Sequence, residues 1–392
     1  MKKISLIAAI TVLTSFAYAQ NRSIEFDHSE WKTLLAKAKK ENKLIFVDCY
    51  TTWCGPCKFM AKTVFTNDTV ADFYNTNFVN AKIDMEKGEG LKLAKQYGIK
   101  AYPTMLYVNG DGEQIHRTCG SSYAQDFIAA GKDAMDPEKQ MASYARKFKK
   151  GSADASLAYT YFGLLDNACQ KYESELENYF FKQKETEYTS RGSWNLIKTY
   201  VNTYDSKIYQ HLEKNKAAYA ALYSVDSVED KINTVYKIRL NTAMFDKDKQ
   251  VYADLKAKYK LLGNKETEKV LAFSDLNMLF QEKNWTAFAP AMNEYMKKYN
   301  DLDAGRINRY AWSVYEEVND PVILENAAVW IKRAIELQNI YSFNDTYAWI
   351  LFKLGKKEEA RMIAEKAIAL AKQNNEDHTE TDELLKKIAT IE

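Results

Sequence analysis

"TTWCGPCKFM", residues 51–60, holds two cysteines separated by Gly and Pro. A pair with this spacing can be a redox couple, half of a metal site or a structural bridge. The spacing alone leaves all three readings open. The residues on either side of the pair distinguish between them.

The residues before and after the pair predict a strand that gives way to a helix. Residues 44–50 form a short apolar run of β-favouring side chains with a single charge, Asp48, which is typical of a buried strand. From Lys58 to Phe65, apolar residues recur at helical spacing. Cys54 is therefore expected on the first turn of a helix, where free backbone N–H groups and the positive end of the helix dipole stabilise a thiolate.

This arrangement resembles the thioredoxin fold and its Trp-Cys-Gly-Pro-Cys-Lys active site, and in particular the exported thioredoxin-like disulfide interchange domains. The resemblance covers about residues 24–134, and its separate motifs occur in order at suitable distances. It implies an α/β domain with the cysteine pair at the end of a buried strand. The other matching stretches are a helix and turn at 31–43, a strand ending in Asp at 78–84, a turn at 97–104 that leads into a strand at 105–108, and a hairpin through 109–119.

The resemblance implies a role for each residue around the pair. Cys54 would be the attacking thiol, and Cys57 the resolving thiol that closes the disulfide and frees the product. Gly55 and Pro56 would form the active-site turn, and Pro56 suits a first helical turn, where its missing N–H costs nothing. Asp48 stands where the family keeps a buried acid. Since burial raises a carboxyl pKa, Asp48 could shuttle a proton to Cys57 through water; the alternative is an exposed Asp at the strand end.

Three further residues are implied in substrate binding. Trp53 would form an apolar rim beside Cys54. Pro103 would be cis and lie next to the sulfurs, and the backbone of Tyr102 would pair with an extended substrate segment as an added strand. Tyr102 stands where the common family pattern has Ile, so the substrate preference is left open. Residues 85–91 make a somewhat different connection from the usual one.

The other cysteines are expected to be unpaired. The chain has five cysteines, so at least one has no partner within the chain. We expect Cys49 to be a buried, inert thiol on the face of its strand opposite Asp48. Cys119 and Cys169 are expected to be packing thiols, and a Cys49–Cys119 bridge has no support in the sequence.

Two alternatives to a redox couple remain for the Cys54–Cys57 pair. A structural zinc site usually needs two paired sets of ligands, but there is no second close cysteine pair and the four histidines are scattered. The sequence therefore predicts no metal and no cofactor. A permanently closed structural disulfide is the second alternative, although a Gly-Pro turn at a helix start favours an exchangeable pair.

The first 19 residues have the pattern of a secretory signal peptide. Two lysines precede an apolar run from Ile4 to Phe16, and Ala17-Tyr18-Ala19 is a small-x-small cleavage motif. Removal of these lysines takes the formal net charge from +2 to about 0, which gives no electrostatic case for binding nucleic acid or anionic lipid. No later segment has 18 consecutive apolar residues, so no membrane span is predicted after cleavage. We expect an exported, soluble chain in a bacterial periplasm, with an extracellular destination as the alternative.

From about residue 136 the sequence changes to long amphipathic stretches, which predict an all-α region over 136–392. Residues 327–337 align with 360–370, and Tyr310-Ala-Trp aligns with Tyr347-Ala-Trp. The second of these units resembles a tetratricopeptide repeat, a motif of about 34 residues in which small residues sit where paired helices cross. Stacked repeats leave a concave surface that often binds peptides or proteins. The alternative is that these helices only stabilise the redox domain.

The sequence therefore predicts a signal peptide at 1–19, an α/β thioredoxin-like domain at 20–135 and a tetratricopeptide-like helical domain at 136–392. The predicted function is an exported thiol–disulfide oxidoreductase, and a reductant because Gly-Pro is the dipeptide of reducing family members. Its partners would be disulfide-containing or dithiol proteins, a protein that recharges the pair, and a peptide or protein ligand on the helical repeats. The alternative is a non-catalytic scaffold whose repeats bind partners, for which two exchangeable thiols have no use.

Overall fold

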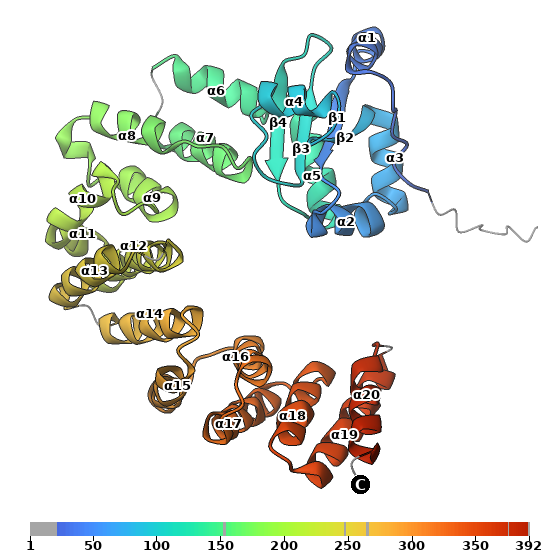
Figure 1. Ribbon diagram of the computed structural model, residues 1–392. Coiled ribbons are helices and arrows are strands. Elements are labelled where there is room, and N and C mark those ends of the chain that lie inside the picture. Colours follow the sequence, from blue (N-terminus) through green and yellow to red (C-terminus); the bar gives the residue numbers. More distant parts are fainter. Residues whose placement is uncertain (1–21, 152–153, 247, 264–265, 375, 391–392) are drawn as a thin grey trace, which may run out of the picture. The chain divides into compact units, whose positions relative to one another are not determined.

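The computed structural model describes residues 22–151, 154–246, 248–263, 266–374 and 376–390 (Figure 1). The predicted signal peptide lies outside these residues. The chain divides into two compact units. The first runs to Val201 and includes Asp205–Leu212, and the second consists of Asn202–Tyr204 and the chain from Glu213 onward. The predicted boundary between 135 and 136 stays a prediction.

The first unit is built on a four-stranded sheet in the order β2-β1-β3-β4. β1 pairs in parallel with β2 and antiparallel with β3, which pairs antiparallel with β4. The strands predicted at 44–50 and 78–84 are confirmed, and the one predicted at 105–108 begins one residue earlier. Their bounds are β1 Leu44–Tyr50, β2 Phe78–Asp84, β3 Thr104–Val108 and β4 Gln114–Cys119.

Helices cover both faces of this sheet, and each face has its own apolar core (Figure 1). Because successive side chains of a strand alternate between faces, Val47 of β1 packs with α1 and α4, whereas Phe46 packs with η1, α3 and α5. The predicted α/β class is confirmed. The bounds are α1 Trp31–Glu41, α2 Gly55–Phe59, the π-helix η1 Met60–Val64, α3 Asp68–Asn77, α4 Gly90–Gln96 and α5 Ala124–Met135.

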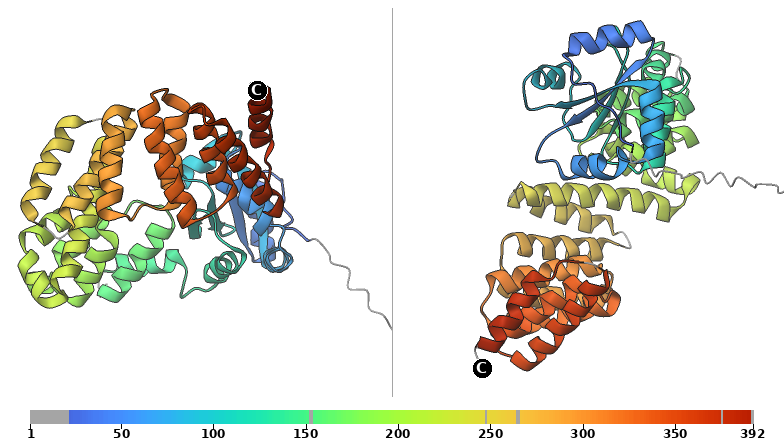
Figure 2. Two further views of the ribbon diagram at one scale, coloured as in Figure 1. Left: turned by 90° about the horizontal axis from the view of Figure 1, so that it is seen from below. Right: turned by 90° about the vertical axis from the view of Figure 1, so that its right-hand side faces the viewer.

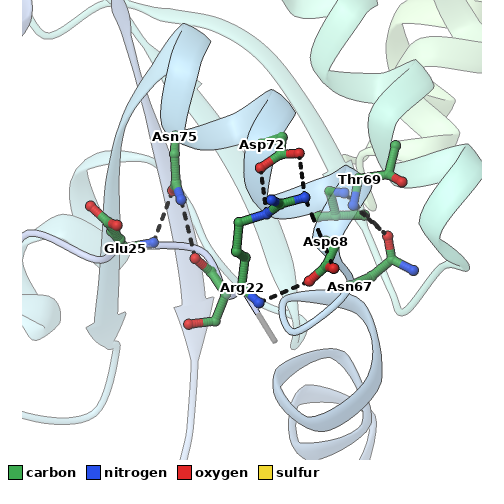
Figure 3. Close-up of polar contacts among 9 residues, drawn as sticks. Arg22, Glu25, Asn67, Asp68, Thr69, Asp72 and Asn75 are labelled. Atoms are coloured by element: carbon green, nitrogen blue, oxygen red, sulfur yellow. Dashed lines mark hydrogen bonds and ion pairs between the residues drawn. The ribbon is translucent and has the colours of Figure 1, made fainter. Parts of the chain in front are cut away.

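Polar contacts fasten the segment before α1 to α3 (Figure 3). The backbone N–H of Arg22 donates to Asp68 Oδ1 at 2.8 Å, and its guanidinium reaches Asp72 Oδ2 at 2.9 Å. Asn75 accepts from the backbone N–H of Glu25 and donates to the carbonyl of Ser23. These groups are exposed, so each contact contributes little alone, and together they fix the course of the chain that leads into the sheet domain.

Two contacts join the edge strand β4 to the helices that follow α5. His116 on β4 is buried, and its Nδ1 accepts from the backbone N–H of Met141 at 3.2 Å. Burial lowers the pKa of His116 to about 4, so the ring is neutral near pH 7 and can accept. Cys119 at the end of β4 forms a disulfide with Cys169, with an S–S distance of 2.13 Å.

This disulfide corrects the prediction that Cys119 and Cys169 are packing thiols. The two residues are 50 apart in the sequence, and they meet because α7 contacts β4. Cys49 is the only free cysteine in the described part of the chain, and it is buried on the opposite face from Asp48, as predicted. The remaining helices of the first unit are α6 Met141–Lys149, α7 Ala155–Asn167, α8 Glu173–Lys182, the 3-10 helix η2 Glu185–Glu187, α9 Arg191–Tyr200 and α10 Lys207–Lys214.

The second unit is entirely helical over its described residues, as predicted, and its last helices lie side by side (Figure 2). The helices are α11 Lys216–Tyr223, α12 Val225–Phe245, α13 Lys249–Leu262, α14 Thr267–Gln281, α15 Trp285–Tyr299, α16 Ala304–Glu317, α17 Pro321–Leu337, α18 Tyr341–Lys353, α19 Lys357–Asn374 and α20 Thr379–Thr390. No helix in the described ranges combines the length and the apolar character needed to cross a membrane.

The two aligned stretches of sequence occupy the successive helix pairs α16–α17 and α18–α19. Ala348, Ala360 and Ala367 are completely buried, in agreement with small residues at close helix crossings. Gly355 between α18 and α19 has a φ of +77°, a conformation that glycine adopts without steric cost. The tetratricopeptide assignment itself stays a prediction.

Candidate active site

The Cys54–Cys57 disulfide forms at the start of α2. Cys54 is the N-cap of this helix, one position before the predicted first turn, and its sulfur accepts from the backbone N–H of Cys57 at 3.1 Å. The two sulfurs are bonded at 2.03 Å. Pro56 stands in the first turn, where no N–H is needed. In the reduced protein, the same N–H group and the positive helix end would stabilise a thiolate on Cys54.

The loop before β3 carries the cis peptide that the resemblance implied, between Tyr102 and Pro103. The carbonyl of Pro103 accepts from the backbone N–H of Gly120 at 2.8 Å, so the loop is tied to the chain after β4. Cys54 and Cys57 are 2% and 3% exposed, respectively. Because so little of either cysteine is accessible, a partner has to make close contact with the surface around them to reach a sulfur.

Asp48 is completely buried, so the alternative of an exposed strand-end Asp is wrong. It lies on the face of β1 that carries Phe46, and Met60 of η1 packs in the same apolar cluster. Burial raises the pKa of Asp48 to about 6, although the ammonium of Lys82, 3.3 Å from Oδ2, acts in the opposite direction. The carboxyl group is thus buried beneath the helical segment that begins with the cysteine pair, and its pKa lies close to neutral pH.

Lys82 was not singled out in the sequence. It lies opposite Asp48 in the β1–β2 register, and its ammonium is 4.9 Å from the centre of the Tyr50 ring and 5.6 Å from that of Phe65. The sequence did offer a signal, because pairing the strand that contains Asp48 with the strand that ends in Asp84 puts Lys82 beside the acid. That inference requires the residue-by-residue pairing of β1 with β2, which cannot be read from the sequence.

Replacement of Asp48 by asparagine is expected to stabilise the protein at alkaline pH. The unfolded chain has an Asp48 pKa near 3.8 and the folded one about 6, so the folded state favours the protonated acid. The stability that the folded protein gains from this preference is fully present below pH 3.8 and is lost as the pH rises through 6. We expect a gain of about 2 kcal/mol at pH 8, somewhat less than the roughly 3 kcal/mol of the shift because Lys82 loses its partner.

Denaturant unfolding at pH 4 and pH 8 checks this expectation. The Asp111→Asn variant is the control, because Asp111 is an exposed carboxylate in the turn between β3 and β4. Equal stability of Asp48→Asn and wild type at pH 8 would contradict a raised pKa.

Two aromatic side chains that flank the cysteine pair in the sequence, Trp53 before it and Phe59 after it, form edge-on ring pairs. The ring of Trp53 meets that of Tyr102 edge-on, with centroids 6.0 Å apart, and its indole Nε1 donates to Glu86 Oε2 at 2.9 Å. A second edge-on pair is formed by Phe59 at the end of α2 and Tyr123 before α5, also 6.0 Å apart. Trp53 was expected at the rim. Glu86, Phe59 and Tyr123 were missed, because their neighbours in space are distant in sequence.

No group of three or more potential metal-ligating side chains occurs within the ranges that the structure describes. The sulfurs of Cys54 and Cys57 are bonded to each other. This buried, helix-capping disulfide on an α/β sheet defines the class of site: a dithiol–disulfide exchange centre.

Comparison with known proteins gives the family. The thioredoxin family model matches residues 22–132. Thioredoxin H4 of Arabidopsis thaliana is 33% identical over 24% of this chain and 72% of its own length, and a thioredoxin H-type of Chlamydomonas reinhardtii is 36% identical over 26% and 81%. Through this domain, the chain belongs to the thioredoxin family. The family and the Cys54–Cys57 pair together support thiol–disulfide oxidoreductase activity.

Solved structures were compared as well. A Bacteroides thetaiotaomicron chain assigned provisionally as a disulphide-isomerase is 47% identical, over 30% of this chain and 98% of that chain, with a TM-score of 0.28. The C-terminal domain of Neisseria meningitidis DsbD in the oxidised form is 25% identical, over 29% and 99%, with a TM-score of 0.25.

Proposed function

We propose that this protein is an exported thiol–disulfide oxidoreductase that reduces disulfides in polypeptide substrates through Cys54 and Cys57. The observation that carries the proposal is the Cys54–Cys57 disulfide at the N-terminus of α2 in a chain with a cis peptide before Pro103. Metal or cofactor chemistry is not needed for it, because two thiols supply both electrons.

The proposed reaction has two exchange steps. The Cys54 thiolate attacks one sulfur of the substrate disulfide, forming a mixed disulfide and releasing the other substrate sulfur as a thiolate that takes up a proton. Cys57 then loses its proton and attacks the sulfur of Cys54. The mixed disulfide breaks, the second substrate thiol leaves, and the Cys54–Cys57 disulfide closes. The substrate gains two electrons and the protein loses two.

Asp48 and Lys82 fit the proton transfer in the second step. Cys57 is a poor nucleophile until it is deprotonated, and a carboxyl group with a pKa of about 6 can accept a proton near neutral pH. Lys82 stabilises the charged form of Asp48 from 3.3 Å. In this proposal Asp48 acts through a bridging water, and the Tyr102 backbone pairs with the substrate segment while Trp53 lies beside it.

The helical region is proposed to hold partners. A groove of about 720 Å³ lies between α13, α14 and α15, and Tyr295 and Tyr299 line it together with side chains of both charges, including Lys256 and Asp275. Tyrosine is enriched where proteins bind one another. The alternative function, a scaffold without catalysis, shares this groove but leaves the cysteine pair without a use.

Export is supported by two independent features. Residues 1–19 have the signal-peptide pattern, and the chain has a second disulfide, Cys119–Cys169, outside the exchange centre. Disulfides of this kind persist in oxidising compartments and are rare in the cytosol. The periplasm is the proposed compartment.

A redox titration of the chain from Gln20 onward tests the proposal. Free thiols are trapped at each potential, and Cys54 and Cys57 are assigned by mass. A midpoint near about −270 mV is expected for a reductant. A midpoint near about −120 mV would instead indicate an oxidant. If the Cys54–Cys57 disulfide is not reduced at any accessible potential, the proposed enzyme activity is rejected and the non-catalytic scaffold is favoured.

A further inference from the structure

The rim of the exchange centre on the Tyr102 side combines aromatic and acidic groups. Trp53 is 65% exposed, its ring forms an edge-to-face pair with that of Tyr102, and its Nε1 donates to Glu86 Oε2. Because the N–H donates to a carboxylate, the electron density of the indole ring is increased. An exposed ring face with a negative charge at its edge is therefore present next to Cys54.

Two acidic side chains, Glu86 and Asp84, lie on this side of the site. The backbone N–H of Glu86 donates to Asp84 Oδ1 at 3.1 Å, which brings the two acidic residues together. Lys87 lies 3.3 Å from Asp84, but its side chain is 69% exposed, so the pair is well screened. Burial is the largest cause of the raised pKa of the Tyr102 hydroxyl, and the carboxylates of Glu86 and Asp84 raise it further, in agreement with negative charge at the rim.

The loop that carries Glu86 is fixed by its backbone. The N–H of Met85 donates to the carbonyl of Tyr50 at 2.9 Å, and the N–H of Gly90 to that of Lys87 at 3.0 Å. A Cβ atom on Gly90 would lie 2.0 Å from the carbonyl oxygen of Asp84, so only glycine permits this close approach. The backbone position of Glu86 is thus fixed, and its carboxylate accepts from Trp53 Nε1.

We propose that this acidic aromatic rim, defined as Trp53, Asp84, Glu86 and Tyr102, selects polypeptide disulfides with a lysine or arginine beside the cysteine that Cys54 attacks. A cation over the exposed indole face is attracted by the ring and by the Glu86 carboxylate. A neutral side chain gains neither interaction, and an acidic one is repelled. The inference rests on the proposed function, since it requires a polypeptide disulfide at Cys54.

The expected preference is modest because the rim is exposed. A cation–π contact and an ion pair at such a site together favour the cationic substrate by about 3- to 10-fold in the second-order rate constant. The preference should fall as salt is added, because exposed charges are screened.

The test uses the reduced chain from Gln20 onward and three synthetic peptides, each closed by one intramolecular disulfide. The peptides are identical except for lysine, norleucine or glutamate directly before the first cysteine. Oxidation of Cys54 and Cys57 is followed by rapid acid quench and thiol alkylation. The order lysine, norleucine, glutamate supports the inference.

Two matched variants locate the source of the preference. Glu86→Gln removes the charge but keeps an oxygen that can accept from Trp53, and it should bring the lysine-to-norleucine ratio close to 1. Glu41→Gln removes one charge from an exposed position before β1, at the end of that strand remote from Cys54, and it should leave the ratio unchanged.

Equal rates for the lysine and norleucine peptides would overturn the inference while leaving the proposed function intact. The same holds if Glu86→Gln keeps the wild-type ratio. If no peptide is reduced, the proposed function fails, and the inference fails with it.

Discussion

Replacement of Cys54 by serine is expected to abolish disulfide reduction, down to the uncatalysed rate. The sulfur of Cys54 caps α2 and is the one that the helix N-terminus stabilises as a thiolate, whereas a serine hydroxyl is not ionised at neutral pH. Turnover of a disulfide-bonded protein such as insulin, with dithiothreitol as electron donor, measures the loss. Disulfide reduction by this variant at the wild-type rate would contradict the proposed mechanism.

The Cys57→Ser variant separates the two proposed steps. Its Cys54 still attacks, but no resolving thiol follows, so the substrate should accumulate as a mixed disulfide that is visible by mass. Cys49→Ala is the matched control, because Cys49 is buried on the opposite face of β1 and burial raises its pKa far above the ordinary value. The control should keep wild-type turnover.

Loss of the Cys119–Cys169 disulfide is expected to lower the free energy of unfolding of the first unit by about 4 kcal/mol. The bond closes a loop between residues 50 apart, and without it the unfolded chain gains the entropy of that loop. It also fastens α7 to β4, whose last residue, Cys119, lies opposite Thr104 at the start of β3. Denaturant unfolding of the Cys119→Ser/Cys169→Ser variant measures the difference.

This measurement is best made with Cys54 and Cys57 both replaced by serine, so that Cys119–Cys169 is the only disulfide of the described structure that remains. In that background, dithiothreitol should destabilise the protein when Cys119 and Cys169 are present, and it should have no effect when they are replaced. The two single variants should each cost as much as the double one, because each breaks the same bond. Additive losses would indicate that the cysteines contribute separately.

Much of the exchange centre could be predicted because it depends on local order in the chain. An apolar β-favouring run, a cysteine at its end and a helical period after it place Cys54 at a helix start without knowledge of the rest of the fold. The alternation of side chains along β1 put Asp48 and Cys49 on opposite faces, and both are buried there.

The partners of these residues could not be predicted in the same way. Lys82 reaches Asp48 through the register of two strands, and Glu86 reaches Trp53 through a loop that the sequence marked only as unusual. Both contacts depend on where separate elements are placed in space. A pattern within one element carries no information about such a placement.

The helical character of the remainder and the place of the cysteine pair at a helix start could be predicted from the sequence, because hydrophobic period and helix-start chemistry are properties of short segments. The α/β class of the first domain was implied by the resemblance that its ordered motifs carry. The bond between Cys119 and Cys169, by contrast, follows from the tertiary structure alone. Which thiols meet depends on how α7 folds back onto β4, and two cysteines can bond only where the backbone brings their Cα atoms within bonding reach, here 5.8 Å.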